Sequence, residues 1–566
     1  MVEFKINKTL RNFLIAVAAI VVVFVIISFL PDKDFSEKYA GVDLTASELS
    51  STSKTYAEYK KEYSFAKNAS ATVDVDILSF DAAKSSGTHA EKNYYGKDVV
   101  VTEDESFVTW NVQVPESGFY NISMEYIAIP SRNVNMERAL YINGEIPFSG
   151  AEILSFYRLW KDGGPIREDN QGNSIRPSQV EFFEYQTANF KSDLGYEVDP
   201  YCFYFEKGEN TIGLKSSNEP MAISKLTLKP IIKYDTYQQY LAKQPGKPED
   251  DKGTGVHLKV QGEQSSRRSD PSLFARYDRS SAVTEPYSVK NTILNYTGGD
   301  PWKSPGQWIE WELDIPEDGW YTISIKGRQF YQRGYVSSRS VYIDGEIPID
   351  TLKSVDFPYS SDWEMQTLSD DDGKPYNFYL SKGKHTIRLE ATLGKVGELI
   401  SELQDSVYRL NTIYRTILVL TGTYPDQFRD YEIEKVYPAE VEAMNLESKR
   451  LYSLIDRFVQ VTGQKSNQIA PAETLAVQLE QFYKRPDKIT KAFQNFKDNI
   501  TSLGSSLLSM TETKLDIDYL LIQSANDRVK PVKGGFFKNA KHEILSFVTS
   551  FFVDSASLGN VYDEDG

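Results

Sequence analysis

The chain has 566 residues, enough for three or four domains of ordinary size. It is 40% hydrophobic and 13% aromatic, which excludes an intrinsically disordered polypeptide. The net charge of −17 argues against nucleic acid as a partner. The single cysteine, Cys202, excludes an intramolecular disulfide and thiolate-rich zinc or iron–sulfur sites.

Residues 13–30 form an apolar run without a charge, preceded by Lys5, Lys8 and Arg11. As a helix this run would be about 27 Å long, close to the thickness of a bilayer core. The basic residues before it place the N-terminus in the cytoplasm and the rest of the chain outside. The alternative is a cleaved signal peptide, but residues 28–31 (SFLP) make a poor cleavage site. We therefore predict a signal anchor over residues 1–31 and a single-pass protein of the cell membrane, with its bulk extracellular.

Residues 32–69 are polar and predict a stalk that lifts the body of the protein from the membrane. Tyr56, Tyr59 and Tyr63 recur at helical spacing, which indicates a short helix within it.

Two segments of the chain recur 201 residues apart. WNVQVPESGFY at 110–120 matches WELDIPEDGWY at 311–321, and RALYINGEIP at 138–147 matches RSVYIDGEIP at 339–348. A third pair, KGENTI at 207–212 and KGKHTI at 382–387, is 175 residues apart, so the first copy has a longer insertion. Matched segments at one spacing indicate a domain duplication.

Each copy has the pattern of antiparallel β structure. Apolar residues alternate along the segments, and Pro-Glu-x-Gly, Asn-Gly and Asp-Gly provide the turns. We predict β-sandwiches over residues 70–232 and 255–393. Residues 233–254, rich in proline, glycine and charge, form the predicted linker.

The order of these motifs resembles family 6 and family 35 carbohydrate-binding modules, which are galactose-binding-like jelly rolls. The resemblance implies a structural calcium ion, which an acidic residue of the first strand often holds in such modules. Residues 260–263 (VQGE) look like that strand in the second copy, so the resemblance makes Glu263 the calcium candidate. No other cofactor is predicted.

All seven tryptophans lie in the two β domains. Trp110 and Trp311 occupy matched strand positions, so we interpret them as core residues. Sugars stack on aromatic rings, and loop aromatics are the better candidates for this role. A loop tryptophan that packs under its own loop is an equally good interpretation. The predicted ligand-binding residues are Tyr157, Trp160, Trp302, Tyr331, Arg333 and Trp363.

From about residue 396 the apolar residues recur every three or four positions, as in amphipathic helices. We expect helices over 396–421, 439–461, 471–483, 486–510, 515–526 and 536–553, forming a helical domain over 394–566. The predicted fold class is therefore multidomain: an N-terminal transmembrane helix, two antiparallel β-sandwich (jelly-roll) domains and an all-α C-terminal bundle.

The sequence contains none of the common local catalytic motifs. It has no Gly-x-Ser-x-Gly elbow, no P-loop and no His-Glu-x-x-His motif, and Cys202 lies in an apolar predicted strand. We predict that the chain is not an enzyme.

The order of parts, with LNTIYRTI at 410–417 and YPDQFRDY at 424–431, resembles the N-terminal half of large extracellular solute-binding proteins of bacterial sugar ABC importers. In that family a two-lobed solute-binding module follows the helices. The resemblance implies a non-catalytic, membrane-anchored carbohydrate-binding protein of a sugar import system. Its partners would be a carbohydrate or cell-wall glycan and an importer permease or a separate solute-binding module. The alternative is an envelope scaffold or adhesin whose β-sandwiches bind protein or wall polymer.

Overall fold

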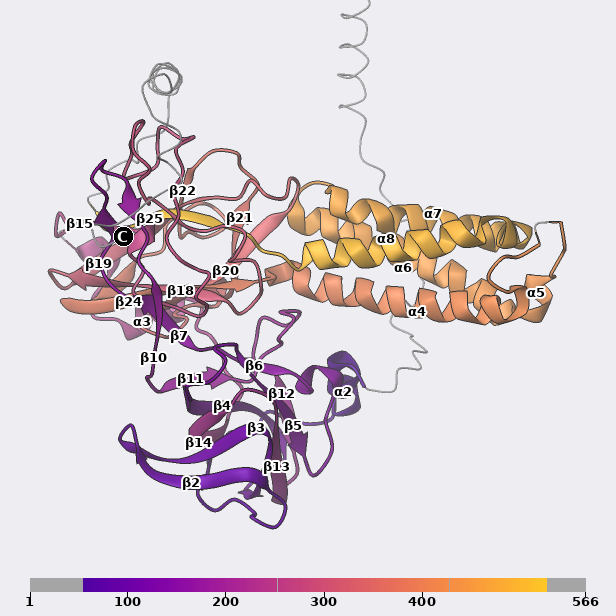
Figure 1. Ribbon diagram of the computed structural model, residues 1–566, viewed down its shortest axis with the longest axis horizontal. Coiled ribbons are helices and arrows are strands. Elements are labelled where there is room, and N and C mark those ends of the chain that lie inside the picture. The colour runs from indigo at the N-terminus through magenta and orange to yellow at the C-terminus, as the bar shows by residue number, and fades with distance from the viewer. Residues whose placement is uncertain (1–53, 252, 427, 527–566) are drawn as a thin grey trace, which may run out of the picture.

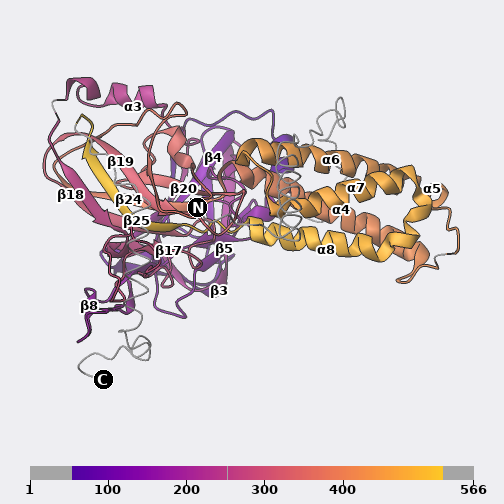
Figure 2. The same ribbon diagram turned by 90° about the horizontal axis from the view of Figure 1, so that it is seen from above.

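The computed structural model describes residues 54–251, 253–426 and 428–526. Two antiparallel β-sandwiches lie side by side, and a bundle of long helices projects from the second one (Figures 1 and 2). Within the described ranges, no helix is long and apolar enough to cross a bilayer. The predicted anchor, the stalk up to residue 53 and the helix predicted over 536–553 lie outside the described residues.

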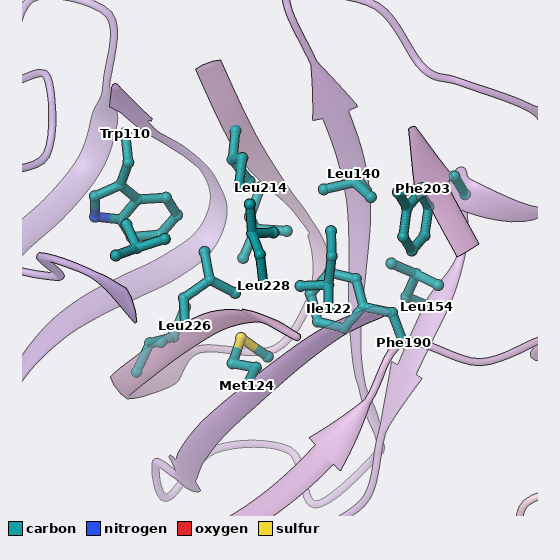
Figure 3. Packing of buried hydrophobic residues seen from close by; sticks show 14 of the residues in the cluster. Trp110, Ile122, Met124, Leu140, Leu154, Phe190, Phe203, Leu214, Leu226 and Leu228 are labelled. Atoms are coloured by element: carbon teal, nitrogen blue, oxygen red, sulfur yellow. The ribbon is translucent and has the colours of Figure 1, made fainter. Parts of the chain in front are cut away.

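The first sandwich is one continuous sheet that bends into two layers. Strand β3 is shared between the layers, because residues 100–102 pair with β14 while residues 107–114 pair with β13. Trp110, Ile122, Leu214 and Leu226 are buried between the layers (Figure 3). The strands are β1 Val73–Val75, β2 Ser86–Tyr94, β3 Lys97–Val114, β4 Gly118–Ala128, β5 Met136–Ile142, β6 Leu154–Phe156, β11 Gln186–Asn189, β12 Cys202–Phe205, β13 Gly208–Asn218 and β14 Met221–Lys229.

The second sandwich has two separate sheets that enclose a core around Trp311. One sheet has the order β10-β7-β16-β18-β24-β20-β21, in which β7 (Leu159–Asp162) and β10 (Gln179–Phe182) come from the insertion of the first copy. The other sheet has the order β15-β25-β19-β22, with β17 and β23 added. The strands after residue 250 are β15 His257–Gln261, β16 Arg267–Arg268, β17 Thr297–Gly298, β18 Trp308–Ile315, β19 Gly319–Arg328, β20 Val336–Ile343, β21 Val355–Pro358, β22 Glu364–Thr367, β23 Phe378–Leu380, β24 Gly383–Thr392 and β25 Asp516–Ser524.

The repeated motifs adopt the same local structure in both sandwiches. Asn143 and Asp344 have φ of 53° and 52°, as the predicted hairpin turns require. The hydroxyl of Tyr120 donates to the carbonyl of Glu116, and that of Tyr321 donates to the carbonyl of Glu317. The tyrosine therefore fastens the turn that precedes its own strand, which explains why Pro-Glu-x-Gly-x-Tyr recurs as a unit.

A short helix at the start of each copy extends the repeat beyond the predicted boundaries. In α2 (Tyr56–Glu62), the hydroxyl of Tyr59 accepts a hydrogen bond from the backbone N–H of Tyr204 in β12 at 2.8 Å. In α3 (Tyr237–Lys243), the Tyr240 hydroxyl accepts in the same way from the N–H of Tyr379. Residues 54–69 thus pack on the first sandwich instead of forming a free stalk, and α3 belongs to the second sandwich instead of to a linker.

The helix predicted over 515–526 is wrong, because these residues form strand β25. This strand lies in the second sandwich between β15 and β19, where Ile517 and Leu520 are fully buried. Its counterpart in the first sandwich is β14, which pairs with β4 as β25 pairs with β19. In the first copy β13 turns directly into β14, whereas in the second copy the helices lie between β24 and β25. The bundle is therefore an insertion into the second β module.

The helices predicted over 396–421, 439–461 and 471–483 are confirmed, with small differences at their ends, whereas the helix predicted over 486–510 begins only at Phe493, after two 3₁₀ turns. The first long helix ends before Gly422 and the second before Gly463, both with positive φ. Their apolar faces form one core along the bundle. The helices are α4 Gly397–Thr421, α5 Ile433–Val436, α6 Pro438–Thr462, α7 Ala470–Lys484 and α8 Phe493–Met510.

The long insertion of the first copy joins the two sandwiches. Its strands β7 (Leu159–Asp162) and β10 (Gln179–Phe182) extend a sheet of the second sandwich next to β16. There Arg268, which is fully buried, makes two contacts with the carboxylate of Asp162 at 2.9 and 3.0 Å. A small hairpin of β8 (Arg167–Glu168) and β9 (Ser174–Ile175) completes the insertion.

Candidate functional site

Aromatic and charged side chains gather at the end of the second sandwich from which the bundle emerges. They come from the end of β19, the loop after it, the start of β25 and two further connections, between β16 and β17 and between β21 and β22. We call this group the loop-end cluster; it consists of Arg276, Asp278, Tyr296, Arg328, Phe330, Tyr331, Trp363 and Asp516.

Arg328 is the centre of the cluster. Its guanidinium lies 4.4 Å from the ring centroids of both Phe330 and Trp363. It also contacts Asp278 at 2.9 Å and Asp516 at 3.0 Å, so one cation is shared by two carboxylates. Planar stacking with carboxylate contacts at the edge suits arginine in particular. Arg328 therefore holds three different loops in a fixed arrangement.

The two acids respond differently to this environment. Burial raises the pKa of Asp516 to about 6, because the nearby Arg328 only partly compensates for desolvation. Burial also opposes ionisation of Asp278, but hydrogen bonds from Ser280 and the charge of Arg328 outweigh it and lower the pKa. The Tyr331 hydroxyl donates to Asp516 at 2.8 Å.

The outer side of the cluster offers an aromatic surface bordered by polar groups. Phe330 is 42% exposed and Tyr277, next to the cluster, is 51% exposed. Beside them, a side chain on Gly299 would lie 2.8 Å from the Arg276 Nη1 and 2.9 Å from the Tyr331 oxygen. Glycine at this position lets both polar groups approach the same stretch of backbone. Such a surface can stack on the C–H face of a sugar and bond to its hydroxyl groups.

The first sandwich lacks this arrangement at the matched positions. Ile127, Ile129 and Pro130 stand where the second copy has Arg328, Phe330 and Tyr331. The same end is instead closed by buried Arg158, which contacts Glu181 at 2.6 Å and Glu219. The two copies have therefore diverged, and the aromatic cluster belongs to the second.

Three predicted ligand contacts lie at or near the cluster. Tyr331 and Trp363 belong to it, and Arg333 is exposed in the loop after Phe330. Trp363 is only 8% exposed and donates its ring N–H to Asp278 at 3.1 Å. Its role in the structure is to support Arg328, while Phe330 presents the exposed ring.

The prediction for Trp302 is corrected by its burial. The ring is fully buried, the guanidinium of Arg339 covers it at 4.1 Å, and its N–H bonds to the carbonyl of Gln307 in the same loop. A ring without an exposed face cannot stack on a sugar. The alternative interpretation, a tryptophan that packs under its own loop, is the one that the structure shows.

Trp160 and Tyr157 lie at the joint between the sandwiches and not at a ligand surface. Trp160 is 6% exposed in β7, between β10 and β16. The Tyr157 hydroxyl donates to the carbonyl of Pro305, in the second sandwich, at 3.1 Å. Both side chains therefore connect the two modules.

Phe330, Arg276, Asp278 and Asp516 are not among the predicted ligand-binding residues. Phe330 stands directly before Tyr331, so its neighbours provided a signal. Asp516 lies in the segment that was predicted to be helical, and no local pattern connects it with residues near 328.

The calcium candidate Glu263 is buried close to Asp518. Burial and then the charge of Asp518 raise the pKa of Glu263 to about 8, and its Oε2 atom has no hydrogen-bond partner. Lys326 already lies 2.9 Å from Asp518. In the described ranges no three His, Cys, Asp or Glu side chains are grouped so as to hold a metal ion. The side chains present thus supply two neighbouring carboxylates and no third ligand of these types.

Comparisons with known proteins concern the bundle and the sandwiches separately. Residues 398–513 match the family model of the bacterial solute-binding protein, 4-helix bundle domain. The predicted resemblance of the helical region to bacterial solute-binding proteins is thereby confirmed. No curated protein sequence matches the chain.

Solved structures that are similar to part of this chain include several carbohydrate-binding modules. A family 35 module from Clostridium thermocellum is 16% identical, with 28% of this chain and 98% of that one covered and a TM-score of 0.17. The C-terminal family 6 module of LamC, a laminarinase from Zobellia galactanivorans, is 14% identical, with 28% and 99% covered and a TM-score of 0.17. A family 35 module in complex with a glucuronic acid containing disaccharide is 16% identical, with 28% and 94% covered and a TM-score of 0.19. At these scores the structures carry no information on what this chain binds.

Proposed function

We propose that the chain is a non-catalytic carbohydrate-binding protein of a bacterial sugar import system, anchored in the membrane and extracellular. The observation that carries this proposal is the solute-binding-protein bundle, which is inserted into a β module directly beside the loop-end cluster. A domain typical of solute-binding proteins and a surface suited to sugars therefore meet at one place in the fold.

The cluster would bind a sugar by stacking and hydrogen bonding. Phe330 provides the ring face, and Tyr331 and Arg276 provide polar groups beside it. Asp278 and Asp516 are both engaged by Arg328, so this site offers no free carboxylate pair for glycoside hydrolysis. This arrangement supports binding without catalysis.

The membrane location and the import partners are supported by the sequence alone. The apolar run over 13–30 with its preceding basic residues supports an anchor with the body outside the cell. The bundle match supports partners from an import system, namely a permease or a solute-binding module.

A glycan array probed with the full-length protein in detergent tests the binding proposal. We expect binding that Phe330→Ala and Tyr331→Ala each weaken about tenfold. Tyr424→Ala is the matched control, because Tyr424 is 89% exposed at the far end of the bundle. Absence of binding to any glycan would contradict the proposal and favour an envelope scaffold. Binding that neither cluster variant affects would contradict the assigned site.

A further inference from the structure

Two arginines from different copies of the β module come together beside the loop-end cluster. Arg176 follows β9 in the insertion of the first copy, and Arg276 belongs to the second copy. Arg176 donates from Nε to the carbonyl of Ala275 at 3.1 Å, the residue directly before Arg276. Burial, and after it the positive charge of Arg276, lowers the pKa of Arg176, as expected where two cations lie near each other.

Contacts at the joint between the two sandwiches bring Arg176 close to Arg276. The N–H of Ser174 donates to the carbonyl of Thr292 at 2.8 Å, and the N–H of Thr292 donates to the side chain of Asn173 at 2.9 Å. Arg176 itself stacks on Phe274 at 4.0 Å. The small hairpin of the first copy is thus docked against the segment that carries Arg276, and the position of Arg176 is fixed before any ligand arrives.

Backbone hydrogen bonds also fix the segment that carries Arg276. The N–H of Arg276 donates to the carbonyl of Tyr296 at 2.8 Å, and the carbonyl of Arg276 accepts from the N–H of Asn295 at 2.8 Å. At its tip, Nη1 lies beside Gly299, whose φ of 81° suits glycine. Arg276 therefore points toward the Tyr331 hydroxyl, at the polar border of the aromatic surface.

The neighbouring acidic side chains form ion pairs with other cations. Asp278 and Asp516 contact Arg328, and Asp300 contacts Lys514 at 2.8 Å. Among the residues that the structure describes, neither Arg176 nor Arg276 takes part in an ion pair. Asp300 lies near enough to Arg276 for the arginine to help lower its pKa, but the ion pair of Asp300 is with Lys514. The two guanidinium groups therefore have no ion-pair partner of their own and leave a local positive site for an anion, in a chain with a net charge of −17.

We propose that Arg176 and Arg276 together bind an anionic group, a carboxylate or a phosphate ester, on the saccharide that stacks at the loop-end cluster. This inference rests on the proposed function and deepens it, because it names the ligand class as a charged glycan. It also assigns a reason for the longer insertion of the first copy: the insertion delivers the second arginine to a site that the second copy could not complete alone.

Titration of the full-length protein in detergent with three probes tests this site. The probes are an oligogalacturonate, a poly(glycerol phosphate) oligomer and a neutral galactan oligosaccharide of similar length. We expect at least one anionic probe to bind about tenfold more tightly than the neutral probe. This preference should fall as NaCl is raised from about 50 to about 500 mM. The carboxylate and phosphate arms identify which anion the site prefers.

Variants separate this inference from the proposed function. Arg176→Gln should remove most of the preference for the anionic probe while leaving neutral binding unchanged, whereas Arg276→Gln should remove the preference and also weaken neutral binding, because Arg276 borders the aromatic surface. Phe330→Ala should weaken all probes alike. Arg415→Gln, an exposed arginine on α4, is the matched control and should change nothing. Circular dichroism melts of each variant exclude unfolding as the cause.

The outcomes are distinct. Equal affinity for the neutral and anionic probes, with a ratio that neither glutamine variant changes, would overturn the anion site and leave the proposed function intact. Absence of binding to all three probes, with no rise in Tm when inorganic phosphate is added, would overturn the anion site, while the glycan array decides the proposed function. A rise in Tm with phosphate that the double variant loses, without glycan binding, would support the anion site and contradict the sugar.

Discussion

Arg328 and Asp516 are 188 residues apart in the chain, yet they are directly paired across β19 and β25 and their side chains meet at 3.0 Å. The contact exists because the whole bundle is inserted between two neighbouring strands of one β module. The first residue after the bundle that re-enters the sheet is therefore also a member of the loop-end cluster. Side chains along β20 and its preceding loop hold the same return segment, since Tyr335 donates to the carbonyl of Met510 and Ser337 to that of Lys514.

Removing the charge of Asp516 should destabilise the second sandwich. Asp516→Asn keeps an acceptor for Tyr331 but leaves Arg328 with one carboxylate, and we expect a loss of about 1–3 kcal/mol in the free energy of unfolding. Asp426→Asn, in an exposed loop of the bundle, should change stability by less than about 0.5 kcal/mol. Urea unfolding followed by tryptophan fluorescence measures both. Equal effects of the two variants would argue against the shared role of Arg328.

Truncation tests whether the bundle is an insertion into the second β module or an independent helical domain. A chain that ends at residue 512 lacks β25, whose Leu515, Ile517 and Leu520 are fully buried in the second core. We expect the second sandwich to lose cooperative unfolding and to become sensitive to protease. A chain that ends at residue 526 keeps β25 and should retain the transition. A truncation at 512 that melts like the longer chain would contradict the insertion.

The buried carboxyl of Glu263 should make stability depend on pH. Its pKa is raised to about 8 in the folded state from an ordinary value of 4.5, so the folded protein binds the proton more tightly than the unfolded one. The free energy of unfolding should therefore fall as pH rises from about 4.5 to about 8, by up to roughly 4 kcal/mol, and level off above that. Glu263→Gln should remove most of this slope.

Thermal melts at the upper end of this pH range test whether the Glu263 carboxyl binds calcium. Bound calcium would favour the charged carboxylate, so millimolar calcium should raise the Tm of the wild type at pH 8 and leave the Glu263→Gln protein unchanged. A wild-type Tm that calcium does not move would mean that this carboxyl pair holds no calcium.

Tyr59 of α2 and Tyr240 of α3 offer a matched test of the repeat. Tyr59→Phe and Tyr240→Phe each leave a backbone N–H of a neighbouring strand without its acceptor. We expect each to cost about 1–2 kcal/mol, and the two costs to be similar because the contacts are equivalent. Tyr424→Phe, at an exposed position, is the control for loss of a hydroxyl. A clear cost for one tyrosine only would show that the helices play different roles in the two copies.

Local patterns were sufficient for most of the secondary structure. The turns at Asn143 and Asp344 were predictable because positive φ is a property of a few residues, and the ends of α4 and α6 were predictable from Gly422 and Gly463. Residues 515–526 were not, since a strand buried on both faces has apolar residues without the alternation that marks a half-exposed strand. Only its partners in the sheet make β25 a strand.

The sequence by itself determined the duplication, the two β modules, the long helices and the resemblance to solute-binding proteins, because these depend on motifs and spacings that short stretches of chain contain. Tertiary structure alone decided where the modules begin and end, which aromatic rings are exposed, and which charges meet. Trp302 and Phe330 show the difference: both are aromatic loop residues, but one is fully buried beneath Arg339 and the other is 42% exposed beside Arg328. Burial depends on residues distant in the chain, and so does the meeting of Arg176 with Arg276 across the joint of the two copies.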